Sequence, residues 1–488
     1  MADSFLLPES VKDFIFDLHD SCRRSQNLNE QKSLYTQTLK DITSKYFSSS
    51  PFPPPEAIKN ECESDGLFLA FYDELATRHL FTSMRPGLAE KLESWKVYLR
   101  LFDRVLEASA DAIDMVILPE WIFEIMHEFV YQFQGFCQHR TQVKSRTTSD
   151  IETLKANPAS WAVETVMFYL HNLIRVGSVK NAGQVQATFG HFASASLSRL
   201  ECLLGDYHSC LSALAPFDLF DRSEIFYEVF SARLNVFYHA GISYFALRRY
   251  GDCVSVFQVM CSDINRGMKT GVLKHLAGYD QFGKLHEKML ALIAIVTNIF
   301  PSIKIPDSLS KVIGDKYSDK LAKINSGEDG YEDLFTFACP KFISPVLPDY
   351  ANTSTNLSVE AYRHQVATFM GDISQQVQLP KMRSYLKLYS SIGIKKLAAF
   401  NDVGENEFLS RLICFKHKSF QVVMNPNTKN PLEGDRTNVA DIFYYIDKEM
   451  VVVDEMNRQQ QFEKFFVNQI VHCEDIRADL EMVQVPGQ

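Results

Sequence analysis

The sequence has no apolar run long enough to cross a membrane, and it opens without a recognisable secretory leader. Its longest apolar runs, such as Met289–Val296, fall far short of the about 20 residues that a transmembrane helix requires. The opening MADSFLLPES carries an acidic residue where a signal peptide carries a basic one. The ten cysteines form no CxxC pair and no metal-ligand spacing, which indicates reduced, mostly buried thiols. We therefore expect a cytoplasmic protein with no membrane contact.

The common catalytic sequence motifs are also missing. HExxH, GxSxG, GxGxxG and HRD do not occur. Gly278–Lys284 approaches a phosphate-binding loop, but Leu285 stands where a serine or threonine must bind magnesium, and the context is helical. His127 lies beside Glu128 but has no second histidine one turn on, because Tyr131 occupies that position. We therefore predict no enzyme, with no catalytic, cofactor-binding or metal-binding residues and no cofactor.

Most of the chain has the apolar spacing of helices, which predicts a mostly α fold. Glu120–Arg140 is apolar on two flanks and predicts a buried helix, whereas the polar stretch Lys144–Pro158 predicts an exposed loop. Gly205–Leu214 is echoed by Arg249–Phe257, at an offset of 43 residues. Each copy supplies a turn, a tyrosine and the start of a second helix. The pattern resembles tetratricopeptide helix pairs at a longer period than usual and predicts an irregular, TPR-like helical-repeat solenoid.

Two proline-rich stretches interrupt the helical pattern. Ser48–Pro55 (SSSPFPPP) has the composition of a linker. Tyr331–Tyr350 (YEDLFTFACPKFISPVLPDY) begins as an apolar turn of helix and then breaks at three prolines. Because it is too apolar to remain in water, we expect it to be packed, as a joint between the helical array and the module that follows.

After this joint, Val359–Val377 predicts another helix, and the pattern changes beyond it. Arg383–Ser391, Ile394–Phe400 and Asn406–Phe420 predict three short helices, and the strand-like runs that follow predict a β-hairpin, a combination typical of a winged helix. The predicted strands are Phe420–Met424, Ile442–Ile446 and Met450–Val453. We expect Met450–Val453 to offer an exposed edge for strand pairing.

The C-terminal segment Gln460–Val483 predicts a helix with one apolar stripe. The candidate intersubunit residues of the stripe are Phe462, Phe466, Ile470, Ile476 and Leu480. An apolar stripe of this kind is expected to pack against another surface. Two candidate surfaces remain open, namely helices of partner chains and the winged helix of this chain.

The charge of the chain is uneven. The whole chain carries −10, whereas eight basic and three acidic residues give Lys381–Lys418 a local net charge of +5. The candidate contacts for RNA or a partner are Lys395, Lys396, Arg411, Lys416 and Lys418. The alternatives are a solvated face or a face paired with an acidic partner, since charge alone carries no specificity.

These patterns predict five consecutive parts. They are an N-terminal helix and Pro-rich linker (1–57), an N-terminal helical region (58–195), TPR-like repeats (196–380), a winged helix (381–455) and a C-terminal bundle helix (456–488).

An ordered set of segments resembles the PCI family, whose members are scaffold subunits of the proteasome lid, the signalosome and eukaryotic translation initiation factor 3. The segments that carry the resemblance are FLAFYDELATRHLF (Phe68–Phe81), EWIFEIMHEFVYQFQGFCQHR (Glu120–Arg140), LLGDY (Leu203–Tyr207), ALRRYGDCVSVF (Ala246–Phe257), CPKFISPVLPDY (Cys339–Tyr350), RSYLKLYSSIGIKKLAAF (Arg383–Phe400), FKHK (Phe415–Lys418) and FYYIDKEM (Phe443–Met450). The closer match is to one subunit of the initiation factor. The first 60 residues and Val176–Phe192 depart from the family pattern, so contacts made through them do not carry over.

The resemblance implies a non-catalytic scaffold subunit of initiation factor 3 that supports binding to the small ribosomal subunit and assembly of the preinitiation complex. It implies a repeat array followed by a winged helix in one PCI module. The implied partners are the K subunit and the PCI subunits of that factor, the small ribosomal subunit, and mRNA or rRNA. The alternatives are a PCI scaffold of the proteasome lid or signalosome, and an RNA-contacting winged-helix adaptor.

Overall fold

The computed structural model divides the chain by its contacts into two units. One comprises Met1–Val377 and Gln421–Thr437, and the other comprises Gln378–Phe420 and Asn438–Gln488. The structure describes residues 7–24, 27–108, 113–276, 279–301, 303–326, 329–351, 356–377, 379–425, 429–440 and 442–454, with positions 466, 469, 470, 473, 474, 476 and 477 near the C-terminus. The five-part division expected from the sequence stays a prediction.

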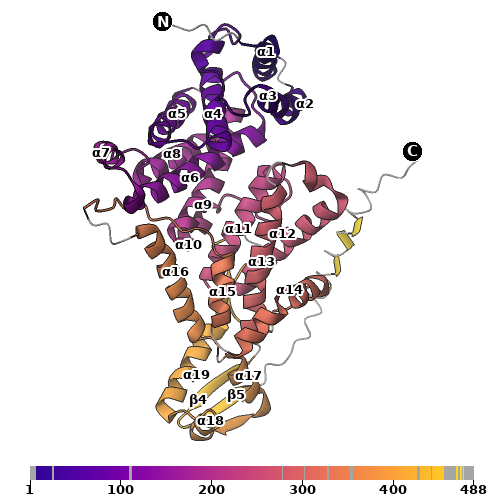
Figure 1. Ribbon diagram of the computed structural model, residues 1–488. Coiled ribbons are helices and arrows are strands. Elements are labelled where there is room, and N and C mark those ends of the chain that lie inside the picture. Colours follow the sequence, from indigo (N-terminus) through magenta and orange to yellow (C-terminus); the bar gives the residue numbers. More distant parts are fainter. Residues whose placement is uncertain are drawn as a thin grey trace. The chain divides into compact units, whose positions relative to one another are not determined.

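The first unit, here called the helical unit, is an array of packed helices (Figure 1). Its helices are α1 Glu9–Arg23, α2 Leu28–Ser33, α3 Leu39–Tyr46, α4 Gly66–Ser83, α5 Leu88–Glu107, α6 Pro119–Thr141, α7 Thr148–Ala156, α8 Val163–Gly177, α9 Gln184–Leu204, α10 Tyr207–Ala213, α11 Phe230–Ala246, α12 Tyr250–Thr270, α13 Tyr279–Ile299, α14 Asp307–Ser326, α15 Asp329–Ala338 and α16 Leu357–Ser374. Among the described residues, none of the helices is both long and apolar enough to span a bilayer. Tyr279–Ile299 covers most of the stretch that approached a phosphate-binding loop, and it is a plain helix.

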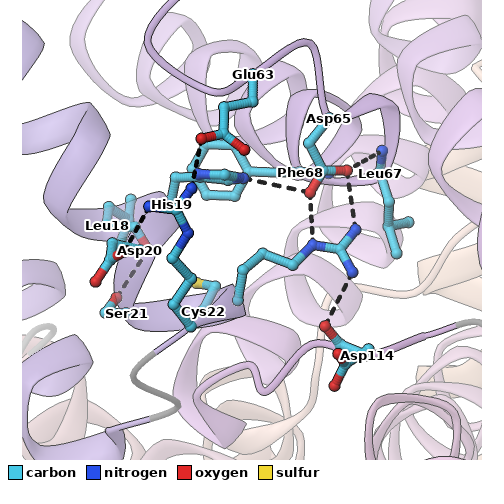
Figure 2. A network of polar contacts seen from close by, with 12 residues as sticks. Leu18, His19, Asp20, Ser21, Cys22, Glu63, Asp65, Leu67, Phe68 and Asp114 are labelled. Carbon is cyan, nitrogen blue, oxygen red and sulfur yellow. Dashed lines mark hydrogen bonds and ion pairs between the residues drawn. The ribbon is translucent and has the colours of Figure 1, made fainter.

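The N-terminal helix α1 is tied to the start of α4 by a two-pronged ion pair. Arg23 donates from Nε to Asp65 Oδ2 at 2.5 Å and from Nη2 to Oδ1 at 2.9 Å. Asp65 also caps α4 by accepting from the amides of Leu67 and Phe68 (Figure 2). Burial alone would raise the pKa of Asp65, but Arg23 and the two amides lower it below its ordinary value. The carboxylate therefore fixes the position of α1 while it ends the loop before α4.

The Pro-rich segment after α3 does not behave as a free linker. The Tyr72 hydroxyl on α4 donates to the Pro53 carbonyl at 3.1 Å, and the Phe52 ring stacks on His79 with 4.2 Å between centroids. Prolines fix an extended path here, and that path lies against α4.

Helix α6 runs through the interior, as its two apolar flanks predicted. Phe129 lies at its centre, fully buried, and packs against Phe102 of α5 and the Trp161 ring. The Trp161 indole donates to the Lys91 carbonyl at 2.9 Å, so its polar edge is satisfied within an aromatic core.

Helices α8 and α9 cross closely at two glycines. A Cβ added to Gly177 would lie 2.7 Å from the Gly190 Cα, and one added to Gly190 would lie 2.9 Å from the Gly177 Cα. The backbones therefore meet where neither residue carries a side chain. This crossing falls in Val176–Phe192, the stretch that the sequence was expected to set apart from the family pattern.

The two sequence echoes form two helix pairs, α9 with α10 and α11 with α12. Tyr207 and Tyr250 each begin the second helix of a pair, and Gly205 ends α9 at a φ of +90°. Cys210 and Cys253 are fully buried between the helices. The prediction of a mostly α, irregular helical-repeat fold is confirmed.

The proline-rich segment that follows α15 is packed, as expected, but it is not the boundary between the units. Ile343 donates its amide to the Leu203 carbonyl at 2.9 Å, and Arg140 donates to the Pro345 carbonyl at 2.7 Å. Helix α16 and the chain to Val377 still belong to the helical unit. The joint assignment was wrong in this respect, because the segment is held inside the array.

The second unit, here called the winged-helix unit, contains three helices and a small sheet. Its elements are α17 Leu379–Leu388, β1 Ser391–Gly393, α18 Ile394–Phe400, α19 Glu405–Ser419, β4 Phe443–Asp447 and β5 Met450–Asp454. A separate two-stranded ribbon, β2 Phe420–Val423 with β3 Asp435–Asn438, carries the chain into and out of the helical unit. The three-helix and hairpin pattern read from the sequence is confirmed as a small winged-helix region.

The sheet corrects one prediction. Its strand order is β1-β5-β4, with Ser391 opposite Val452 and Tyr445 also opposite Val452. Met450–Val453 therefore lies at the centre of the sheet and was wrongly expected at its edge. In the part of this sheet that the structure describes, the edge strands are β1 and β4.

One further expectation fails in the helical unit. Lys144–Pro158 contains helix α7 rather than only an exposed loop. Thr147 and Asp150 close a capping box, in which the Thr147 hydroxyl accepts from the Asp150 amide at 3.1 Å.

Candidate interaction surfaces

The segment between β2 and β3 is held on α11 and α12 by one buried arginine. Arg249 donates to three successive carbonyls, those of Pro431 at 2.9 Å, Leu432 at 2.8 Å and Glu433 at 3.0 Å. Its side chain is 6% exposed, and its Nε donates to Asp252 at 2.7 Å. The planar guanidinium thus serves four acceptors at once, which a lysine cannot do. We call this arrangement the Arg249 latch.

Asp252 completes the latch from the same helix. Its carboxylate accepts the Met424 amide, at 2.9 Å to Oδ1 and 3.1 Å to Oδ2. Burial raises the pKa of Asp252 above its ordinary value, against the lowering effect of the Met424 amide and Arg249. The Tyr244 hydroxyl adds a bond of 2.9 Å to the Pro431 carbonyl. The sequence reasoning missed these residues, although an Arg and an Asp three positions apart in an otherwise apolar stretch were a usable signal.

The candidate basic contacts lie on two helices of the winged-helix unit. Lys395 and Lys396 are both exposed on α18, and Lys395 forms an ion pair of 3.3 Å with Glu449. Arg411 on α19 forms an ion pair of 2.7 Å with Glu407. Glu449 raises the pKa of Lys395, so this amine keeps its charge across the neutral range.

The remaining two basic candidates lie on opposite flanks of α19. Lys416 sits over the Phe443 and Tyr444 rings, 5.4 and 5.9 Å from their centroids. Lys418 is seven residues from Arg411 and shares its side, whereas Lys416 is five residues from Arg411. The five residues are therefore brought into one small unit but not onto one face.

The C-terminal stripe is exposed wherever the structure describes it. Phe466 is 60% exposed, Ile470 58% and Ile476 47%, and all three are helical. Phe462 and Leu480 lie outside the described residues. Exposed large apolar side chains of this kind are candidates for an interaction surface.

The winged-helix unit has a second exposed apolar face, which sequence reasoning did not single out. It consists of Tyr385 and Leu388 on α17 and Phe400 on α18, and we call it the α17–α18 face. Leu388 is 75% exposed and Phe400 43%. The apolar spacing of α17 could have revealed it, because Met382 and Leu386 already account for the buried side.

The buried polar groups of the helical unit serve packing. Glu74 and Glu124 both pair with Arg78, and burial raises the pKa of Glu74 to about 7. His127 lies beside Arg199, and burial with this cation lowers the pKa of His127 well below its usual value. Among the described residues, no group of three or more His, Cys, Asp or Glu is arranged to hold a metal ion.

Two comparisons with known proteins each cover most of the chain. Residues 90–473 match the family model described as RNA polymerase I-associated factor PAF67. The chain is 32% identical over 478 residues to eukaryotic translation initiation factor 3 subunit L of Xenopus tropicalis, across 93% of this chain and 84% of that protein. The same subunit from Nematostella vectensis is 29% identical over 98% of this chain and 94% of its own length. The human subunit is 30% identical over 92% of this chain and 83% of its own length. The subunit that the sequence segments matched most closely is this one, and the chain belongs to the family of eukaryotic translation initiation factor 3 subunit L.

Proposed function

We propose that the chain is a non-catalytic scaffold subunit of the multi-subunit translation initiation factor 3. The observation that carries the proposal is the similarity to subunit L, which extends over 93% of the chain. The relatives carry the name of this factor, which favours it over the proteasome lid and the signalosome. The chain would act in the cytoplasm, where it supports binding to the small ribosomal subunit and preinitiation complex assembly.

The proposed attachment to the complex is the exposed stripe of the C-terminal helix. Phe466, Ile470 and Ile476 are large apolar side chains, each about half exposed or more. Burying each such side chain in a helix bundle contributes about 1.5–3 kcal/mol, enough together for a stable intersubunit contact. The partners in this proposal are the K subunit and the PCI-type subunits, with the repeats and winged helix forming one PCI module.

The test is co-purification of full-length chains that differ only in the stripe. Phe466→Glu with Ile470→Glu should release the chain from the other subunits, because two charges would enter an apolar contact. The matched control is Asn468→Glu with Ala478→Glu, which adds the same charges at positions that helical spacing places away from the stripe. Retention of the stripe variant at the control's level would refute the attachment.

A direct RNA contact is the less favoured role of the basic residues. Lys395, Arg411 and Lys416 already engage a carboxylate or aromatic rings within the unit. We therefore propose these residues as protein contacts. Charge reversal of Lys395, Lys396, Lys416 and Lys418 to Glu should leave crosslinking of the purified chain to RNA unchanged, and loss of crosslinking would restore the RNA role.

A further inference from the structure

We propose that Ser149, on the first turn of α7, is a phosphorylation site whose phosphate is held by the Lys91 and Arg146 cations. The inference goes beyond the proposed function, because it assigns a covalent modification to a part of the helical unit that the assembly role does not use. The phosphate would fix a short helix that buries only one side chain.

Helix α7 is short and lies at the surface. It has nine residues, Thr148–Ala156, and Leu154 is its one buried side chain. An isolated helix of fewer than about 12 residues is only marginally stable in water, so α7 depends on its capping box and on this single anchor. Its first turn therefore opens at low cost, which lets a protein kinase bind the segment in an extended form.

The Ser149 hydroxyl is accessible and unused. Ser149 is exposed, and in the described part of the chain its hydroxyl makes no hydrogen bond. The Thr147 hydroxyl, in contrast, accepts from the Asp150 amide and is engaged in the capping box. Arg146 stands three residues before Ser149. Protein kinases select substrates by such charge patterns, and a basic residue at this spacing before a hydroxyl suits kinases with an acidic substrate groove.

Two cations meet near this turn without a carboxylate partner. The Lys91 ammonium on α5 lies 3.0 Å from His139 Nδ1, and Arg146 donates from Nε to the His139 carbonyl at 3.2 Å. Burial and then Arg146 lower the pKa of Lys91, against the raising effect of Glu90. Within the described ranges, neither Lys91 nor Arg146 forms an ion pair with a carboxylate. Two like charges are therefore held together, an arrangement that a bound anion would relieve.

The first turn of α7 lies beside these cations. Burial lowers the pKa of His139 to about 4, and Lys91 and Arg146 add to the shift, whereas Asp150 opposes it. Asp150 is adjacent to Ser149 and shares the first turn of α7, so charge on this turn already acts on the same cluster. A phosphate at Ser149 would act in the same direction as Asp150, with up to about twice its charge.

The modification is a phosphoryl transfer from ATP. The γ-phosphorus forms a bond to Ser149 Oγ, its bond to the ADP oxygen breaks, and the hydroxyl proton passes to solvent. Ser149 is the second residue of α7, where backbone amides lack helical acceptors and the helix dipole favours an anion. Arg146 and Lys91 add charge-assisted hydrogen bonds, and these contacts outweigh the repulsion from Asp150. The bound phosphate therefore orders the first turn.

The test compares amide hydrogen exchange of the full-length chain with serine or phosphoserine installed at position 149 during synthesis. Phosphoserine should slow exchange in a peptide that covers 148–156 about tenfold, which corresponds to about 1.4 kcal/mol. The matched control is Ala156→phosphoserine at the last residue of α7, where the same charge meets the negative end of the helix and should leave exchange unchanged or faster. With Lys91→Gln and Arg146→Gln, phosphoserine at position 149 should slow exchange by less than about threefold relative to serine in the same background.

A second measurement tests the modification in the cell. Phosphopeptide mass spectrometry of the chain purified from its organism should find phosphate on Ser149, and Ser149→Ala should remove that signal. Absence of phosphate on Ser149 would overturn the site itself. Equal exchange with serine and phosphoserine, equal slowing from position 156, or slowing that the Lys91 and Arg146 substitutions leave unchanged would overturn the bound phosphate. Neither measurement depends on co-purification with other subunits, so the two proposals fail separately.

Discussion

Replacing Arg249 by methionine should open the latch that holds the segment between β2 and β3. Methionine keeps much of the apolar stem but removes all four donor bonds. Removing one partner of a buried ion pair costs about 3–5 kcal/mol, because the other charge stays buried without compensation. Here the loss would leave the Leu432 and Glu433 carbonyls without this donor. The Asp252 carboxylate would keep only the Met424 amide, and the Pro431 carbonyl only the Tyr244 hydroxyl.

The local opening is best measured by amide hydrogen exchange of the full-length chain. A chain of 488 residues with two units is unsuited to a single unfolding free energy, whereas exchange reports each segment by itself. A loss of about 3 kcal/mol predicts exchange roughly 100-fold faster in a peptide that covers 421–437. Peptides from α1 should be unchanged.

Two further substitutions that remove fewer hydrogen bonds of the latch test whether these bonds hold the segment. Tyr244→Phe removes a single hydroxyl bond to the Pro431 carbonyl and should cost only about 0.5–1.5 kcal/mol, or about a threefold to tenfold change. Arg249→Lys should fall between the two, since it keeps the charge but not the fork. If exchange in Arg249→Met stays within about threefold of the wild type, the latch does not hold the segment and this account of it is wrong.

Three further outcomes follow from contacts in the helical unit. Burial lowers the pKa of His239 to about 3, so below pH 6.5 the unfolded segment takes up this proton and the folded one does not, and stability falls as pH falls. Between pH 7 and pH 5 this amounts to about 2 kcal/mol, so amide exchange in a peptide that covers α11, corrected for the intrinsic pH dependence of exchange, should become roughly 25-fold faster, and His239→Gln should flatten that dependence. Gly177→Ala would bring a Cβ within 2.6 Å of the α9 backbone, and a loss of about 1–3 kcal/mol should speed amide exchange in peptides of α8 and α9; Gly135→Ala on α6, with open space around it, should leave exchange in α6 unchanged or slower. Arg23→Met removes the pair with Asp65 and should speed amide exchange in α1 selectively; unchanged exchange there would show that the pair does not hold the helix.

The helices with strong local signals could be read from the sequence, and elements that depend on distant contacts could not. Helix α18 was predicted at Ile394–Phe400 and begins and ends there, because its apolar spacing and flanking residues are local features. Helix α7 was missed because its polar composition outweighed a capping box at Thr147 and Asp150 that was present in the sequence.

The strand order of the sheet could not be predicted from local sequence patterns. Strand β1 has three residues, too few for any periodic signal, and its pairing places β5 at the centre of the sheet. Pairing between residues about 60 positions apart is a property of the folded chain, and a local pattern cannot specify it. The expected edge strand was therefore assigned to the wrong member of the hairpin.

The role of the candidate contacts stays a prediction. The structure shows only that Phe466, Ile470 and Ile476 are helical and exposed. The charge count near the winged helix could not show that Lys416 lies over aromatic rings while Arg411 pairs along its own helix. Arg249 was predicted only as part of a turn. Three of its four acceptors lie more than 180 residues away along the chain, and a local sequence pattern cannot reveal contacts of that kind.

The most direct test of the central claim is affinity purification of the tagged full-length chain from the organism that encodes it, followed by identification of the co-purifying proteins. The account predicts the other subunits of translation initiation factor 3, including its K subunit, together with small ribosomal subunits. Recovery of proteasome lid or signalosome subunits instead, or of the chain alone, would contradict it.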